Sequence, residues 1–94
     1  MAPDNARSDL ADVVAENRRR LLATELSVGQ TMLDAAGATR DDAGRVRRVA
    51  RAWEAHDEVA RHLAGGDVPG LTAAERAELV MGLGQLRARL GDAR

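Results

Sequence analysis

Apolar residues recur at intervals of three and four along most of this 94-residue chain. No segment alternates apolar and polar positions as a half-buried strand would. The three-and-four spacing places apolar side chains on one side of an α-helix, where they can pack against another helix. The sequence therefore predicts an all-α fold.

Glycine and proline divide the chain into three helical segments. The first seven residues are expected to form a flexible tail, and residues 65–71 to form a linker rich in glycine. Residues 8–94 then form a single helical domain, because the chain is long enough for one modest core. The expected helices cover residues 8–36, 40–64 and 73–90.

Residues at the ends of these segments have the chemistry of helix caps. Ser8 is a suitable N-cap for the first helix, and Gly37 is expected to end it in the left-handed conformation. Thr39 is expected to begin the second helix. Thr72 and Glu75 have the spacing of a capping box at the start of the third helix.

The core has to be built almost without aromatic side chains. Trp53 is accompanied by no Phe and no Tyr, so packing depends on Leu, Val and the small Ala. Small domains with such lean cores often need a partner subunit for stability. We therefore expect a long antiparallel helical hairpin and a shorter third helix, packed as a dimeric, coiled-coil-like bundle.

The short connection near Gly37 predicts that the first two helices are antiparallel neighbours. Facing residues then have numbers that add to about 75. This register places the arginines at 18–20 opposite the acidic residues at 54, 57 and 58, and Glu25 opposite Arg48 and Arg51. Each exposed pair contributes only about 0.2–1 kcal/mol, but together the pairs favour one register.

The first helix carries two apolar stripes, which indicates neighbours on two sides. One stripe is expected to face the second helix and contains Leu10, Val14, Leu21, Val28 and Met32. The second stripe is too long for the third helix to cover, so it is expected to form a seam with a second subunit or a partner. That seam consists of Ala15, Leu22, Leu26, Gly29 and Leu33.

Polar residues recur every seven positions within the first stripe, and His56 occupies the matching stripe of the second helix. One interpretation is a core in which Asn17 hydrogen-bonds His56 and the threonines bond their own helix. The other is a polar pocket between the helices that binds a small ligand. Its lining would be Asn17, Thr24, Thr31, Trp53 and His56.

Residues 30–51 loosely resemble a helix-turn-helix, with Gly37 at the turn. The chain departs from that motif at Leu33, where a small residue is usual, and in the length of its first helix. The net charge of -1 gives no general attraction to nucleic acid. If the segment binds DNA, its phosphate or anion contacts would come from Arg40, Arg45, Arg47, Arg48 and Arg51.

Features of a catalytic or metal site are not recognisable in the sequence. The absence of cysteine excludes a disulfide framework and a thiol nucleophile. His56 and His62 are six positions apart, on different sides of a helix, so no metal site is expected. We expect no cofactor, no catalytic residue and no enzymatic activity. The longest apolar runs fall short of a membrane span, and we expect a cytoplasmic location.

The leading functional prediction is a small non-enzymatic interaction module that acts as a homodimer. It would bind an unidentified protein as a regulator, adaptor or assembly factor. Two alternatives remain open: a DNA-binding transcriptional regulator that uses residues 30–51, and a small-ligand sensor with the polar pocket between the first two helices.

Overall fold

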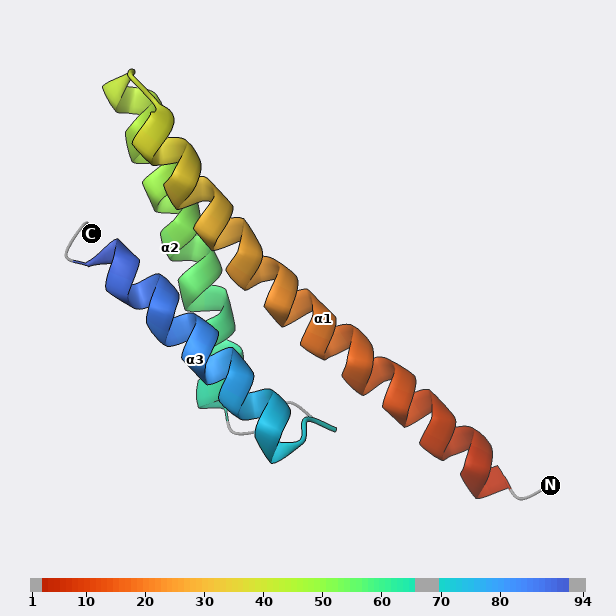
Figure 1. Cartoon of the computed structure of the whole chain (residues 1–94). Coiled ribbons are helices and arrows are strands. Elements are labelled where there is room, and N and C mark those ends of the chain that lie inside the picture. Colours follow the sequence, from red (N-terminus) through yellow and green to blue (C-terminus); the bar gives the residue numbers. More distant parts are fainter. Residues whose placement is uncertain (1–2, 66–69, 92–94) are drawn as a thin grey trace.

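The computed structural model describes residues 3–65 and 70–91. Within these ranges the elements are α1 (Pro3–Ala38), α2 (Asp42–Ala64) and α3 (Ala73–Leu90), with no strand. This confirms the all-α fold. Figure 1 shows α2 and α3 packed beside the C-terminal part of α1, so the N-terminal part of α1 projects from the bundle. The resulting molecule is elongated, with extents of 60 × 19 × 17 Å.

Helix α1 begins earlier than the sequence pattern predicts. Its first residue is Pro3, so the helix includes residues 3–7, which were expected to precede it. Proline suits a first helical position because its φ is already fixed and it lacks an N–H that would need a partner. Ser8 therefore lies inside the helix and is not its N-cap.

The turn between α1 and α2 lies slightly later than expected. Helix α1 continues through Gly37, which does not have a positive φ, so the predicted left-handed cap is wrong. Thr39 closes the end of α1, because its hydroxyl donates to the carbonyl of Ala35 at 2.6 Å. Asp41 is the N-cap of α2, and its carboxylate accepts from the backbone N–H of Gly44 at 2.8 Å. An acidic cap also favours the positive end of the helix dipole.

Helices α1 and α2 form the predicted antiparallel hairpin (Figure 1). Because α1 ends at Ala38 and α2 begins at Asp42, the turn between them lies slightly later in the chain than the sequence pattern predicts. The predicted contact between Glu25 and Arg51 is confirmed, with 2.7 Å between the carboxylate and the guanidinium.

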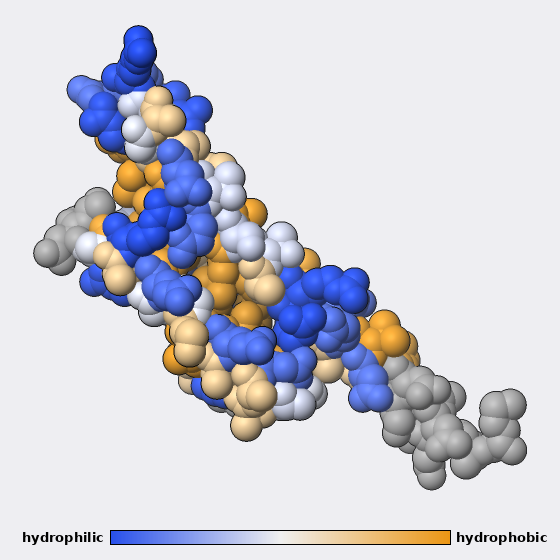
Figure 2. Space-filling model, viewed as in Figure 1, coloured by the Kyte–Doolittle hydropathy of each residue, from blue (hydrophilic) through white to orange (hydrophobic). Residues whose placement is uncertain are grey.

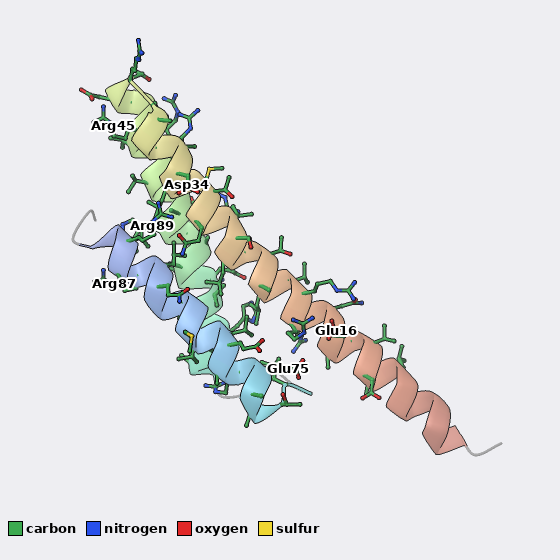
Figure 3. All side chains as sticks on the ribbon, viewed as in Figure 1. Glu16, Asp34, Arg45, Glu75, Arg87 and Arg89 are labelled. Carbon is green, nitrogen blue, oxygen red and sulfur yellow. The ribbon has the colours of Figure 1, made fainter. Side chains whose placement is uncertain are left out.

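The predicted pairing of the arginines at 18–20 with acidic residues of α2 is wrong. Arg19 instead lies between two acidic residues, 2.5 Å from Glu16 in its own helix and 3.2 Å from Glu75 in α3. Arg20 approaches Glu16 at 3.6 Å. The start of α3 therefore lies beside this part of α1, and Figure 3 shows Glu16 and Glu75 on the two neighbouring helices.

Helix α3 runs parallel to α1. Its start is joined to α1 by the contact between Glu75 and Arg19, and its end by Arg89, which lies 2.8 Å from Asp34 (Figure 3). Thr72 and Glu75 form the predicted capping box. Against α2 the direction is antiparallel, since Arg76 donates to the carbonyl of Leu63 at 2.7 Å.

The core lies where the three helices meet. Leu86 of α3 and Val59 of α2 are its largest fully buried side chains. Gly29 allows close packing, because a Cβ at this position would lie 2.7 Å from Leu86 Cδ2 and 3.4 Å from Ala55 Cβ. The buried cluster comprises Leu22, Leu26, Ala52, Trp53, Val59, Leu63, Leu79, Leu86 and Leu90.

Candidate interaction surface

The stripe predicted to be a seam with a partner is part of the core. Leu22 and Leu26 are buried, and Gly29 lies against α2 and α3. Leu33 is partly buried against the same cluster, and Ala15 lies beside Gly70. The predicted seam is therefore wrong: helix α3 lies parallel to α1, and α2 and α3 together cover the length of the stripe that we expected to stay bare.

Most of the other stripe of α1, predicted to face α2, points outward, whereas Met32 at its C-terminal end packs against the core. Leu10, Val14 and Leu21 have exposed fractions of 65%, 49% and 68%. Successive members of this stripe are alternately three and four residues apart over three heptads. This is the repeat found in helices that pair along their length. We call this stripe the outer face; its members are Leu10, Val14, Asn17, Leu21, Thr24, Val28 and Thr31.

The outer face is continuous from the projecting part of α1 into the bundle. Asn17, Thr24 and Thr31 are exposed, and Val28 is half-buried. Val13 adds a further exposed apolar side chain beside Leu10. Figure 2 shows apolar surface on the projecting part of α1, next to a strongly hydrophilic segment. Large apolar side chains gathered on one face mark a contact surface more often than scattered ones do.

Two shallow grooves border the outer face. The first has a volume of about 320 Å³ and is lined by Asn17, Arg20, Leu21 and Thr24. The second, of about 390 Å³, lies where α1 leaves the bundle and is lined by Leu10, Ala11, Asp12, Val14, Ala15, Arg18 and Gly70. Grooves between successive outward side chains are the spaces into which the side chains of a partner helix pack.

Charged side chains hold the projecting part of α1 to the bundle. The hydrogen bond from Arg19 holds the pKa of Glu16 below its ordinary value, and the charge of Arg19 adds to this effect while burial opposes it. The same hydrogen bond raises the pKa of Arg19. Since Arg19 also reaches Glu75, the middle of the outer face lies at the level of a junction between α1 and α3.

The predicted polar pocket is not formed. Asn17, Thr24 and Thr31 lie on the exposed side of α1, whereas Trp53 is buried in the core. His56 Nδ1 lies 3.0 Å from Asp57 Oδ1, so the predicted bond between Asn17 and His56 is wrong. The reason is the orientation of α1, which turns this stripe away from α2.

Trp53 instead contributes to an apolar groove on α2 that the sequence pattern did not reveal. The Arg87 guanidinium carbon lies 4.9 Å from the centroid of the Trp53 ring, a cation–π distance, and His56 packs edge-on at 5.4 Å. The groove has a volume of about 520 Å³. It is lined by Arg45, Val46, Val49, Ala50, Trp53, Glu54 and Asp57.

Three of the five arginines predicted to contact phosphate have partners within the chain. Arg45 lies 2.7 Å from Asp42, and Arg48 donates to the carbonyl of Gly44 at 3.2 Å. Arg51 bonds Glu25, and this hydrogen bond raises the pKa of Arg51. Arg40 and Arg47 are exposed near the turn.

The helices within residues 30–51 do not have the arrangement of a helix-turn-helix. They lie side by side in opposite directions (Figure 1). The two helices of a helix-turn-helix cross at about 90–120°, which allows one of them to enter the major groove. The geometry of that motif is therefore absent from this segment.

The second histidine takes part in a local pair. His62 Nε2 lies 3.1 Å from Glu58 Oε1, one helical turn away on α2. Within residues 3–65 and 70–91, no group of three or more histidine, cysteine or acidic residues is placed to hold a metal ion. The same ranges contain no helix with both the length and the apolarity to cross a membrane.

Comparisons of the chain with protein-family models, with curated proteins and with solved structures give no match.

Proposed function

We propose that the protein is a small, non-enzymatic helical interaction module whose contact surface is the outer face of α1. The observation that carries this proposal is the exposure of Leu10, Val14 and Leu21 on a helix whose other apolar stripe is buried. Burying one such side chain in a contact contributes about 1.5–3 kcal/mol. A partner that covers all of them therefore gains free energy toward offsetting the cost of association.

The spacing of the outer face favours a helix as the bound element. Side chains that alternate at intervals of three and four offer knobs and holes to a helix laid along them. Helix α1 has 36 residues, about 54 Å, so the contact can extend over several turns. The groove lined by Asn17, Arg20, Leu21 and Thr24 lies near the middle of this length.

The proposal is tested by photo-crosslinking from the outer face in the source cell. A benzophenone amino acid at Thr24, which is exposed on this face, should form adducts with a bound partner. The same group at Ala88, exposed on α3, is the matched control. We expect adducts from Thr24 that disappear when Leu21→Glu is added. Equal adducts from both positions, or none from Thr24, contradict the proposal.

A further inference from the structure

We propose that the outer face of α1 binds the same face of a second copy of this chain, with the two helices parallel and in register. This inference rests on the proposed function and names the partner of the same surface. It is carried by the order of apolar and polar residues along the outer face and by the charges at its edges.

The residues of the outer face alternate between two kinds of heptad position. One kind is always apolar and contains Val14, Leu21 and Val28. The other begins with Leu10 and is then polar, at Asn17, Thr24 and Thr31. The two kinds correspond to the a and d positions of a coiled coil, respectively.

This order distinguishes a parallel from an antiparallel pair. In a parallel pair each position meets its own copy, so Val14, Leu21 and Val28 each form an apolar layer. Asn17 then faces the Asn17 of the second copy, and a side-chain amide can both donate and accept a hydrogen bond. In an antiparallel pair a positions meet d positions, so nearly every apolar side chain would pack against Asn or Thr. Parallel pairing therefore avoids burying an unpaired amide against valine or leucine.

The charges beside the outer face agree with the same arrangement. In a parallel pair, a residue at position g lies near the e residue of the second helix that is five positions further along. Arg20 and Glu25 occupy these positions and have opposite charges. The Arg20 side chain is 70% exposed, and its contact with Glu16 is long, at 3.6 Å. Glu25 accepts from Arg51 through Oε1, and a carboxylate has capacity for further donors.

The bundle leaves room for the second copy. The buried residues of α1 that pack in the core, including Leu22, Leu26 and Gly29, lie about a third of a turn away from the outer face. Two copies can therefore approach through their outer faces while each keeps its own core. A pair related by a two-fold axis parallel to α1 presents the same surface from both sides.

Single-cysteine cross-linking tests this arrangement, since the chain contains no cysteine of its own. Leu10→Cys and Val28→Cys place thiols about 27 Å apart along α1. In the parallel pair each thiol meets its own copy, within the separation that a disulfide requires. In any antiparallel pair at least one of the two thiols lies about 27 Å or more from its own copy. Ala88→Cys, exposed on α3, is the control.

We expect both outer-face variants to form covalent dimers rapidly under mild oxidation, and Ala88→Cys to stay monomeric. Adding Leu21→Glu should abolish both dimers. If only one variant cross-links, or if a mixture of the two cross-links faster than either alone, the parallel register is wrong. If neither cross-links while Thr24 still captures another protein in the cell, self-pairing is wrong and the proposed function stands. If both experiments give nothing, both proposals are wrong.

Discussion

Leu21 and Leu22 are neighbours in α1, yet Leu21 is 68% exposed and Leu22 is 5% exposed. Because successive residues of a helix point about 100° apart, this step marks the boundary between the outer face and the core. The two leucines therefore serve different purposes: Leu22 stabilises the chain itself, and Leu21 is available to a partner.

Truncation of the two leucines should separate these purposes. Leu22→Ala is expected to lower the free energy of unfolding by about 2–5 kcal/mol, because it leaves a cavity among buried side chains. Leu21→Ala should change the stability of the isolated chain by only about 0.5 kcal/mol. Urea unfolding in dilute solution, followed by circular dichroism, measures both. If both variants lose the same free energy of unfolding, Leu21 also packs within the chain.

Alanine substitutions at Gly29 and Gly84 provide a second comparison between a core position and an exposed position. A Cβ at Gly29 would lie 2.7 Å from Leu86 Cδ2, in a closed part of the core, whereas nothing lies within 4 Å of a Cβ at Gly84. Gly84→Ala should stabilise α3 by about 0.5–1 kcal/mol through helix propensity. Gly29→Ala should lower the stability of the folded chain. Overpacking of the core costs about 1–3 kcal/mol, which is more than alanine gains through helix propensity. Thermal melting would contradict this packing if both variants shifted the midpoint upward.

Acid should weaken the junction between α1 and α3. The pKa of Glu16 is lowered in the folded protein, first by its hydrogen bond from Arg19. Such a carboxylate contributes stability above its unfolded pKa of about 4.3 and loses it as the pH falls through the lowered folded pKa. Glu16→Gln has no proton to gain, so its unfolding midpoint should fall less than that of the unchanged protein between neutral pH and about pH 3. If the unfolding midpoints of the two proteins fall equally with acid, the pair of Glu16 and Arg19 makes no contribution to stability.

Asn17 is expected to weaken self-association while it keeps the two copies in register. Replacing a polar residue in a helix–helix seam with leucine commonly tightens the pair and relaxes its register. Asn17→Leu should therefore lower the dissociation constant measured by analytical ultracentrifugation. It should also allow Leu10→Cys and Val28→Cys to cross-link with each other. Weaker association of Asn17→Leu would contradict a paired amide layer.

Local signals in the sequence predicted much of the fold. The capping box of Thr72 and Glu75 depends on residues three positions apart, and it is present as predicted. The contact between Glu25 and Arg51 followed from the short connection between α1 and α2. The turn lies later than predicted because Gly37 was expected to stop α1, whereas α1 continues to Ala38 and the hydroxyl of Thr39 bonds the carbonyl of Ala35 in its last turn.

The sequence pattern did not predict which stripe of α1 faces inward. Both stripes have helical spacing, so the choice depends on where α2 and α3 pack, which is a tertiary property. One signal favoured the correct answer: Asn17, Thr24 and Thr31 all fall in one stripe, and polar residues in a stripe favour its exposure. The predicted seam and the polar pocket were both wrong for this single reason.

The molar mass in solution tests the central claim most directly. The chain has a mass of 10.0 kDa, and its elongated shape makes elution volume a poor guide, so light scattering is the suitable method. At micromolar concentration we expect a mass close to twice that of the chain. Leu21→Glu should have the mass of one chain with unchanged helix content, while the exposed control Ala88→Glu should stay dimeric. A single-chain mass for the unchanged protein, or a dimer that survives Leu21→Glu, would contradict pairing through the outer face of α1.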